Sequence, residues 1–599
     1  MIKVSDYIAK RLRDVYGADC AFMVSGGGAM HLNDSIGHYM NYVCNHNEQA
    51  CGIAAEGYAR VNQKLAVVNV TTGPGGLNAL NGVMGQWTDS VPVLYLSGQV
   101  KHSTTMDSCK DIPLRQLGDQ EVDIVSVVKP LTKYAEMVRN PYDIKYHLDR
   151  AVYLATHGRM GPTWLDIPLN VQAAMIDETK LREYDPREDE LKLPNTDNEI
   201  KQLSEMIKKA KRPLFVAGHG IRLSGAIKEF EDLVAKLNIP VVTTMNGFDV
   251  IDEKNPNFVA RIGTVANRAG NFALQNADLV ITVGSRNNIR QVSYNWENYA
   301  KNADLVCVDI DAAELDKPTI KPALKINADC KDFIKKLDAV TQPREKTDWN
   351  TWTRDIKAKY PPVTEAPRVA DNPIEPYAFC EKLVKNFDKD AVVVAGNGTA
   401  FLVPFQVGQV KKGQRYIWNS GDASMGYDLP AAIGACFANG CKDTVCIAGD
   451  GSIMMNLQEL QTMRHYNLPI KLFILNNDGY ISIQQTQKNF FNGRMTACSR
   501  DSGVSIPDFM RVGAAFDLPT VKISEKYNLD KQIQNVLKTP GPVVCEVMLT
   551  PGYTFAPKLS AKKLPDGSMV SPSLEDLYPF LPENEMKQNM IANRNINKR

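Results

Sequence analysis

The sequence lacks several features that would define its class at once. No apolar run approaches the roughly 18 residues of a membrane-spanning helix, and residues 1–6 lack the basic-then-apolar pattern of a signal peptide. Long runs of one charge are also missing, and 69 basic residues nearly balance 68 acidic ones. This balance indicates neither nucleic acid nor an anionic membrane as a partner. We therefore expect a cytoplasmic protein.

Cysteine and histidine are present, but without a spacing typical of metal sites or disulfides. The twelve cysteines include no C-x-x-C pair, and Cys307, Cys446 and Cys545 lie within strand-like apolar runs. Such positions are typical of reduced thiols in a core. The length of 599 residues, with 44% hydrophobic and 23% charged residues, indicates a globular chain of about three or four domains.

Short apolar runs alternate with helical patterns along almost the whole chain, which predicts βαβ units and parallel sheets. The expected fold class is α/β, with three consecutive doubly wound parallel-sheet domains and a C-terminal tail. We expect the domains at 1–175, 195–342 and 372–553, and the tail at 554–599. The tail is either a lid over a site or a disordered or surface-packed terminus.

The strands are expected at 21–24, 65–70 and 91–96, then at 213–217, 240–243, 279–283 and 305–309, and finally at 392–394, 415–418, 445–448, 470–475 and 543–547. A polar, proline-containing stretch, 175–200, is expected to be a linker, and a Pro- and Lys-rich stretch, 342–372, separates the second set from the third. The first and third domains are candidates for a shared topology.

The most informative segment is 444–477. A strand-like run leads into the turn Gly449-Asp450-Gly451-Ser452, and a second strand-like run ends at Asn476-Asn477. Because the carboxyl ends of parallel strands meet at one edge of a sheet, we expect Asp450 and Asn477 to lie together. Two hard oxygen ligands suit Mg²⁺, and the glycines and the following helix leave room and N–H groups for a diphosphate. A lone GDG is equally typical of a tight turn.

Twenty-four residues, Ser452 to Leu475, separate Gly449-Asp450-Gly451 from Asn476-Asn477, and the spacing resembles the signature of thiamine diphosphate (ThDP) enzymes. Further motifs make the chain similar to the acetohydroxyacid synthase (acetolactate synthase) branch of that family. These motifs are His46-Asn47-Glu48-Gln49, Ala55–Arg60, Thr72-Gly73-Pro74-Gly75 with Asn78, Ser97–Val100, Gly161-Pro162 with Asp166-Ile167-Pro168, and Met425-Gly426-Tyr427 running into Leu429–Ala435.

The resemblance implies ThDP and Mg²⁺ as cofactors and assigns roles by motif position. Glu48 is implied to activate the cofactor through its pyrimidine ring, Met425 to hold the cofactor bent, and Gln120 to orient substrate. Alone, Met425 is equally typical of a core methionine. The implied metal ligands are Asp450, Asn477 and the Gly479 carbonyl. The implied cofactor contacts are Gly73, Pro74, Gly75, Asn78, Gly396, Asn397, Gly398, Thr399, Gly449, Gly451 and Ser452.

The family assembles each active site across two subunits, because the glutamate and the metal ligands belong to different domains. The resemblance therefore implies a homodimer or homotetramer with its active sites at the subunit interface. The substrates would be a small-molecule 2-ketoacid and a ketone.

The second domain carries a separate set of candidate contacts. Gly218 and Gly220, then Gly284 and Arg286, and finally Asp309 stand at the ends of three expected strands, where a dinucleotide-type fold places ligand contacts. The absence of G-x-G-x-x-G argues against a catalytic NAD site. By resemblance the domain binds FAD, with Arg286 and Arg290 as candidates to pair with its diphosphate. Sister enzymes hold ADP or nothing there, so both alternatives stay open.

Three segments depart from the family pattern. Thr486 stands where the family carries a tryptophan, Asp119 where a phenylalanine usually precedes Gln-Glu, and residues 25–28 replace Tyr-Pro-Gly-Gly. These changes add polarity or space, which favours a polar acceptor. We therefore hypothesise a carboligase that decarboxylates pyruvate and transfers a two-carbon acetyl-anion equivalent to a ketone such as a nucleotide-linked 4-keto-6-deoxy sugar.

Other functions stay open. The main alternative is an acetolactate synthase, with pyruvate as donor and acceptor, and the next is a simple 2-ketoacid decarboxylase. A redox enzyme that uses the flavin directly and an inactive cofactor-binding scaffold are further alternatives.

Overall fold

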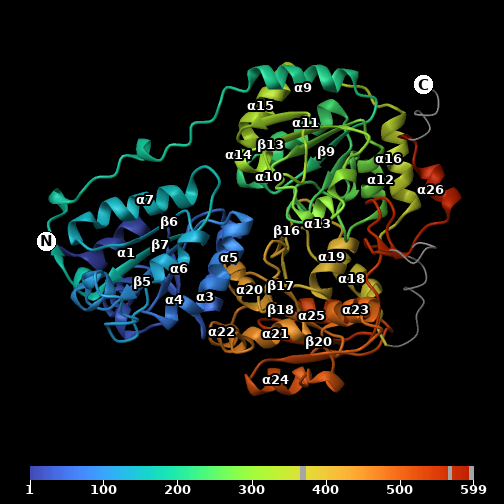
Figure 1. Cartoon of the computed structure of the whole chain (residues 1–599). Coiled ribbons are helices and arrows are strands. Elements are labelled where there is room, and N and C mark those ends of the chain that lie inside the picture. The colour runs from blue at the N-terminus through green and yellow to red at the C-terminus, as the bar shows by residue number, and fades with distance from the viewer. Residues whose placement is uncertain (364–372, 564–568, 593–599) are drawn as a thin grey trace.

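Three six-stranded sheets form the framework of the chain (Figure 1). The computed structural model describes residues 1–363, 373–563 and 569–592. Within each of these sheets, all neighbouring strands run parallel. Figure 1 shows the sheets as three separate lobes with helices packed around them. The expected α/β class, with three consecutive parallel-sheet domains, is confirmed.

The first and third sheets have the same topology. The first contains β2 (Cys20–Met23), β3 (Asn41–Cys44), β4 (Ala66–Val70), β5 (Val93–Gln99), β6 (Tyr134–Met137) and β7 (Thr163–Pro168), in the order β3-β2-β4-β5-β7-β6. The third contains β15 (Val392–Ala395), β16 (Arg415–Trp418), β17 (Thr444–Gly449), β18 (Ile470–Asn476), β19 (Thr520–Ile523) and β20 (Val543–Met548), in the order β16-β15-β17-β18-β20-β19. In both, the strand order reverses next to the first strand, which is where such sheets bind ligands.

The middle sheet has a different order. It contains β9 (Pro213–Ala217), β10 (Val241–Thr243), β11 (Phe258–Arg261), β12 (Leu279–Val283), β13 (Asp304–Asp309) and β14 (Leu324–Asn327), arranged β11-β10-β9-β12-β13-β14. This 3-2-1-4-5-6 order is that of dinucleotide-binding domains. Every strand expected from the sequence is present to within three residues at each end.

Helices flank the sheet in each of the three lobes. The first lobe has α2 (Met30–Tyr39), α3 (Glu48–Asn62), α4 (Pro74–Asn78) and α5 (Leu80–Asp89). The middle lobe includes α9 (Asp197–Lys209), α12 (Arg268–Asn276), α15 (Cys330–Val340) and α16 (Asp348–Lys359). The third has α18 (Pro376–Lys385), α19 (Thr399–Val407), α20 (Asp428–Ala438), α21 (Asp450–Ile453), α22 (Glu459–His465), α23 (Ile481–Phe490), α24 (Phe509–Ala515) and α25 (Leu529–Lys538), and the tail has α26 (Glu583–Asn589).

Helices α3 and α20 join the first and third domains at backbone contact. A Cβ atom on Gly57 would lie 2.1 Å from the Ala431 carbonyl oxygen, and one on Gly434 would lie 1.8 Å from that of Ala54. Glycine at both positions therefore lets the two helix backbones touch. Around this contact the two domains share one hydrophobic core.

A buried polar network extends from this contact to the middle domain. Arg60 donates to Glu56 at 3.1 Å and to the Trp418 carbonyl at 2.9 Å. Arg415 donates to the Arg60 carbonyl at 3.1 Å and to Asp249 of the middle domain at 2.7 Å. The four charged side chains are all buried. Because removing one partner leaves an uncompensated buried charge, the network favours one arrangement of the three domains.

A buried carboxyl accounts for two of the motifs in the first domain. Asp166 accepts from the Ser97 hydroxyl at 2.6 Å and from the Gln99 amide at 3.1 Å, and Ser97 and Asp166 are paired across β5 and β7. Complete burial raises the pKa of Asp166 to about 7. These motif residues therefore have a structural role inside the sheet.

The stretch expected to separate the second and third domains contains a helix. Trp349 on α16 is buried and donates from Nε1 to the Pro213 carbonyl at 2.9 Å, at the start of β9. Residues 348–359 of this separating stretch therefore form a helix, because an apolar face within a polar stretch packs on the sheet. Residues 364–372 of the same stretch, which include the expected domain boundary at 372, lie outside the described residues.

The described part of the tail packs on the middle domain. Leu574 and Met590 are buried in its core, and the Asn271 amide donates to the Leu574 carbonyl at 2.9 Å. Figure 1 shows α26 on the outer side of this lobe, next to α16. Residues 564–568 and 593–599 of the predicted tail lie outside the described residues. In the described ranges, no helix is both long enough and apolar enough to cross a membrane.

Replacing Gly434 with alanine tests the contact between α3 and α20. Gly434→Ala is expected to destabilise the protein by about 1–3 kcal/mol, the usual cost of overpacking a close contact. The matched control is Gly37→Ala in α2, where a Cβ meets only Tyr42 at 3.9 Å and alanine favours the helix by about 0.5–1 kcal/mol. Calorimetric midpoints of unfolding measure both effects, and an unchanged midpoint for Gly434→Ala would contradict the contact.

The buried Asp166 predicts a pH dependence of stability. The folded protein keeps this carboxyl protonated up to about pH 7, whereas an unfolded aspartate loses its proton near pH 3.9. The contribution of Asp166 to stability is therefore full below about pH 3.9 and falls through pH 7, by at most about 1.4 kcal/mol per pH unit. Unfolding midpoints of wild type and Asp166→Asn should diverge in this window, with wild type losing more as the pH rises. A constant difference would refute the shift.

Candidate active site

Polar groups meet at the carboxyl edge of the third sheet. Asp450 follows β17 and Asn477 follows β18, its neighbour in the sheet. The buried Asp450 carboxylate accepts backbone N–H groups from Gly451 at 2.7 Å, Asn477 at 2.9 Å and Gly479 at 3.1 Å. Burial raises the pKa of Asp450 to about 6. The N–H groups of Asn477 and Gly479 hold the carboxylate against the loop after β18, which carries the other two predicted metal ligands.

The side chain of Asn477 lies beside the other two predicted metal ligands. Its Nδ2 lies 2.5 Å from the Gly479 carbonyl oxygen and 3.4 Å from Asp450 Oδ2. A half-turn of the amide exchanges its nitrogen and oxygen, and then Oδ1 stands beside those two oxygens. Carboxylate, amide and carbonyl oxygens suit Mg²⁺. The structure thus brings the three predicted metal ligands together.

The loop after β15 leads into α19 beside this set. Gly398 is the N-cap of α19 with φ of 55°, a left-handed conformation that favours glycine. A Cβ on Gly396 would lie 2.4 Å from Asp428 Oδ2, so only glycine fits there. Thr399 then opens the helix, whose free N–H groups attract phosphate. The Asn397 side chain instead donates to the Ala423 carbonyl at 3.0 Å.

Met425, the residue predicted to hold the cofactor bent, lies on the loop between β16 and α20. Met425 is partly buried, and the Gly426 N–H after it donates to Ser452 Oγ at 2.9 Å. Ser452 in turn donates to the buried Asp428 at 2.6 Å. Ser452 therefore connects the Met425 loop with the turn that carries Asp450, and its hydroxyl is engaged within the protein.

The predicted catalytic glutamate belongs to a cluster at the edge of the first sheet. Glu48 begins α3 with 8% of its surface exposed and accepts from the Asn78 amide at 3.0 Å. A Cβ on Gly75 would lie 3.3 Å from Glu48 Oε1, and one on Gly73 would lie 1.9 Å from the Gln120 carbonyl oxygen. Glu48, residues 73–78 and the exposed Gln120 are therefore neighbours.

The two clusters occupy different parts of one chain. The hydrogen bond to the Glu48 carboxylate stays within the first domain, and those of Asp450 and Asn477 stay within the third. Figure 1 shows α4 and α23 on opposite sides of the contact between α3 and α20. Next to Glu48, the Asn45 amide and the His46 N–H both donate to the buried Glu459 at 2.8 Å. Sequence patterns did not indicate this structural role of Glu459.

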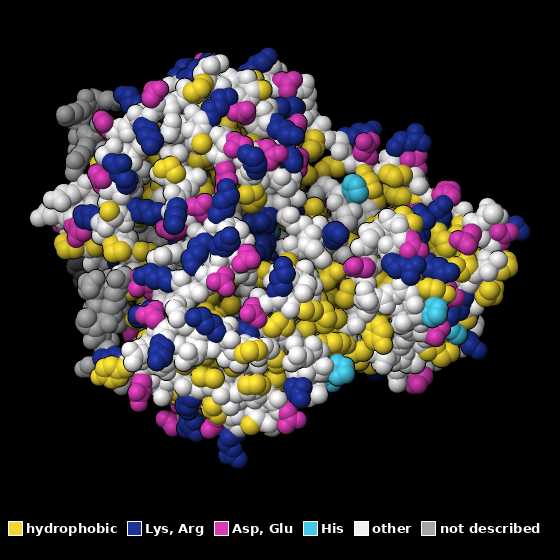
Figure 2. Space-filling model, turned by 180° about the vertical axis from the view of Figure 1, so that it is seen from behind, with side chains coloured by type: hydrophobic (Ala, Val, Ile, Leu, Met, Phe, Trp, Pro, Cys, Tyr) yellow, Lys and Arg dark blue, Asp and Glu magenta, His cyan; other side chains and the backbone are white. Residues whose placement is uncertain are grey.

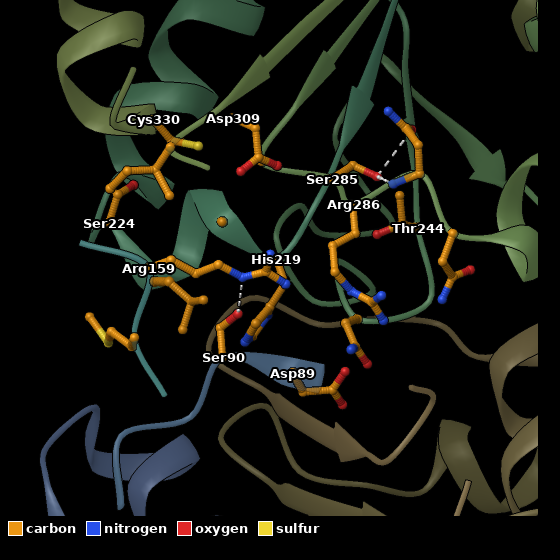
Figure 3. Close-up of a pocket in the computed structure, with 18 of the residues that line it drawn as sticks. Asp89, Ser90, Arg159, His219, Ser224, Thr244, Ser285, Arg286, Asp309 and Cys330 are labelled. Atoms are coloured by element: carbon orange, nitrogen blue, oxygen red, sulfur yellow. Dashed lines mark hydrogen bonds between the residues drawn. The ribbon is translucent and has the colours of Figure 1, made fainter. Parts of the chain in front are cut away.

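A pocket opens at the carboxyl ends of β9, β12 and β13 (Figure 3). Gly220, Gly284 and Asp309 line it. The loops touch, because the Gly218 N–H donates to the Val283 carbonyl and the Gly220 N–H to the Gly284 carbonyl, both at 2.9 Å. A Cβ on Gly218 would lie 2.1 Å from the Gly284 carbonyl oxygen. These glycines therefore allow two loops to meet where the strand order reverses.

Figure 3 shows basic side chains from two domains reaching into this pocket. Arg286 lines it, whereas Arg290 is exposed and is not part of its lining. Arg159 comes from the first domain and pairs with Asp311 at 2.7 Å. Sequence reasoning missed Arg159, because a contribution from another domain leaves no local pattern. The pocket also contains His219, whose buried Nδ1 has no hydrogen-bond partner among the described residues.

Comparisons with known proteins agree with this arrangement. Three family models match the chain in order: thiamine pyrophosphate enzyme, N-terminal TPP binding domain, over residues 2–127; central domain, over 200–337; and C-terminal TPP binding domain, over 378–547. The three sheets and the convergent site residues, taken with these matches, define a class of protein, the ThDP-dependent enzymes.

Curated relatives narrow this class. The chain is 30% identical to the acetolactate synthase large subunit of Cyanidium caldarium, over 90% of this chain and 92% of that protein. It is 30% identical to the acetolactate synthase large subunit of Lactococcus lactis subsp. lactis (strain IL1403), over 93% of this chain and 94% of that protein. It is 28% identical to the acetolactate synthase isozyme 1 large subunit of Escherichia coli (strain K12), over 88% of this chain and 90% of that protein. The chain belongs to the acetolactate synthase-like family, whose members are carboligases and lyases.

Removing the Asp450 carboxylate tests the proposed metal ligands. Asp450→Ala is expected to abolish Mg²⁺-dependent binding of ThDP, because the only carboxylate of the three-oxygen set is lost. Calorimetric titration of ThDP with and without Mg²⁺ measures the effect. The control is Asp478→Asn, which neutralises an exposed neighbouring carboxylate at a left-handed position that asparagine tolerates. Normal titration by Asp450→Ala would refute the assignment.

Proposed function

We propose that the protein is an acetolactate synthase that condenses two molecules of pyruvate and releases CO₂. In this reaction the bond to the donor carboxylate breaks, a bond forms between the two ketone carbons, and a proton goes to the acceptor oxygen. The observation that supports it most is the pair of clusters, around Glu48 and around Asp450, in a chain whose matches to acetolactate synthase large subunits cover about nine-tenths of it.

The chain would contribute positioning and proton transfer. ThDP supplies the chemistry of carbon–carbon cleavage and formation when it is bound. Glu48 would hold a proton at the pyrimidine ring, in a setting shielded from water with Asn78 as its partner. Met425 would contact the cofactor, and Gln120 the substrate. Asp450, Asn477 and the Gly479 carbonyl would hold Mg²⁺, which binds the remaining oxygens of water and diphosphate.

Two subunits would complete each active site. Glu48 and Asp450 face different sides of one chain, so a second copy has to bring a glutamate to each metal site. Large hydrophobic side chains are exposed next to both clusters, namely Leu77 on α4, Met454 and Met455 after the Asp450 turn, and Ile483 and Phe490 on α23. Figure 2 shows hydrophobic side chains gathered where the first and third lobes meet. Burial of such surface favours a homodimer or homotetramer.

The middle pocket would hold a nucleotide, with FAD as the first candidate. The strand order, Arg286 and the unpartnered His219 Nδ1 fit a ligand with phosphates and a hydrogen-bond donor. ADP and an empty pocket are the alternatives. Flavin absorbance of the purified protein distinguishes the three, together with release and identification of any bound nucleotide. A cytoplasmic location stays a prediction from the sequence.

The acceptor proposed here differs from the first hypothesis. The comparisons give no support to a nucleotide-linked keto-sugar, and acetolactate synthesis, the alternative, fits at least as well. Thr486, on which the hypothesis partly rested, is exposed on α23, and its hydroxyl donates to the Ser482 carbonyl at 3.1 Å. A polar residue there therefore does not by itself indicate a polar acceptor.

A time course with labelled pyruvate, ThDP and Mg²⁺ tests the function. Wild type is expected to form acetolactate from pyruvate alone, and Glu48→Gln to lower turnover about 10²–10⁴-fold, the usual contribution of general acid–base catalysis. Glu190→Gln, an exposed glutamate, is the matched control. Acetaldehyde as the only product would indicate a decarboxylase. CO₂ release that requires another ketone would restore the first hypothesis.

A further inference from the structure

The segment that follows β20 reaches the predicted metal site. Tyr553 follows β20, and its hydroxyl lies 3.2 Å from Asn477 Oδ1. The same hydroxyl is hydrogen-bonded to Thr399, whose Oγ1 lies 3.3 Å from Asn477 Oδ1. Segments after β15, β18 and β20 thus converge on one amide group. No motif of the sequence pointed to Tyr553, which lies 76 residues after Asn477.

The segment that carries this phenol, residues 553–558, is held firmly; we refer to it as the strap. The Gln485 amide donates to the Tyr553 carbonyl at 2.9 Å and accepts from Lys558 Nζ at 2.8 Å. The Ala556 N–H donates to Tyr377 Oη at 2.8 Å. Phe555 is buried, with its ring 5.7 Å from that of Tyr553 in an edge-to-face arrangement.

The strap also contacts the middle domain. Lys558 forms an isolated antiparallel bridge with Val265 of that domain and another with Tyr578 of the tail. Directly after the strap, the Leu559 N–H donates to the Thr264 carbonyl of the middle domain at 2.6 Å. The Gln406 amide donates to the Pro557 carbonyl at 2.7 Å. The position of the Tyr553 phenol is therefore set by the junction of two domains.

The two hydroxyls suit either orientation of the Asn477 amide. A hydroxyl both donates and accepts, so Tyr553 and Thr399 can donate to Oδ1 or accept from the NH₂ group. A cation held by Asp450 and the Gly479 carbonyl would favour the orientation in which Oδ1 faces it. The NH₂ group then faces the two hydroxyls and has one acceptor for each hydrogen.

We propose that Tyr553 is a positioning residue for the metal, and that its phenol holds the Asn477 amide with the oxygen turned toward Mg²⁺. The proposal rests on the Mg²⁺–ThDP site described under Proposed function. It makes the segment between β20 and the tail part of the cofactor site. Groups that orient a metal ligand typically change metal affinity by about 10–100-fold when they are removed, and we expect a loss in this range for Tyr553→Phe.

The experiment is a calorimetric titration of Mg²⁺ into full-length protein at saturating ThDP, for wild type and Tyr553→Phe. A parallel titration with Mn²⁺, followed by electron paramagnetic resonance, gives a second readout independent of turnover. The matched control is Tyr377→Phe, which removes a buried hydroxyl bonded to the same strap but in contact with neither Thr399 nor Asn477. Thr399→Val removes the second hydroxyl and should weaken metal binding in the same direction.

The outcomes separate this proposal from the proposed function. Weaker Mg²⁺ binding by Tyr553→Phe, with normal binding by Tyr377→Phe and an unchanged unfolding midpoint without cofactor, supports it. Wild-type affinity in Tyr553→Phe overturns it while the metal site stands, provided that Asp450→Ala does not bind. An equal loss in Tyr553→Phe and Tyr377→Phe overturns it in favour of a role for the strap as a whole. Absence of Mg²⁺-dependent ThDP binding by wild type overturns the proposed site and this inference together.

Discussion

The backbone contact between α3 and α20 is the constraint on which the arrangement of the chain depends. Gly57 and Gly434 allow the helices to approach so closely that any side chain at either position would meet a carbonyl oxygen. Since α3 begins with Glu48 and α20 follows Met425, the contact fixes the glutamate cluster relative to the cofactor cluster. Helices α4 and α23, which adjoin the two clusters, lie on opposite sides of this contact (Figure 1), and this arrangement is why a second subunit enters the proposed mechanism.

Several motifs that resemble those of the family have structural roles here. Ser97, Gln99 and Asp166 form a buried hydrogen-bonded group within the first sheet. Glu56 and Arg60 belong to a buried network that continues through Arg415 to the middle domain. Their spacing reflects the geometry of paired strands and of adjacent helix turns. Motif residues of this kind contribute to the resemblance through the structure that they stabilise.

The predicted metal site depends on backbone groups as much as on side chains. Three N–H groups orient the Asp450 carboxylate, and one of the three predicted oxygen ligands is the Gly479 carbonyl. Such a site needs correct loop conformations more than particular residues, and left-handed glycines such as Gly398 and Gly479 supply them. The strap adds Tyr553 to this edge of the third sheet. Because the strap is also bonded to the middle domain, the position of Tyr553 depends on how the two domains pack together.

The sequence by itself determined the α/β class, nearly all central strands, and the residues at the strand ends, because apolar runs and turn residues are local signals. It also predicted three metal ligands, Asp450, Asn477 and Gly479, whose spacing follows from one βαβ unit and which the structure brings close together. Only the tertiary structure decided that Glu459 supports the Glu48 segment, that Arg159 enters the middle pocket, that α16 packs on β9, and that Tyr553 reaches Asn477. Each of these contacts joins residues far apart in the chain, and a contact that packing creates between distant segments leaves no pattern in either segment.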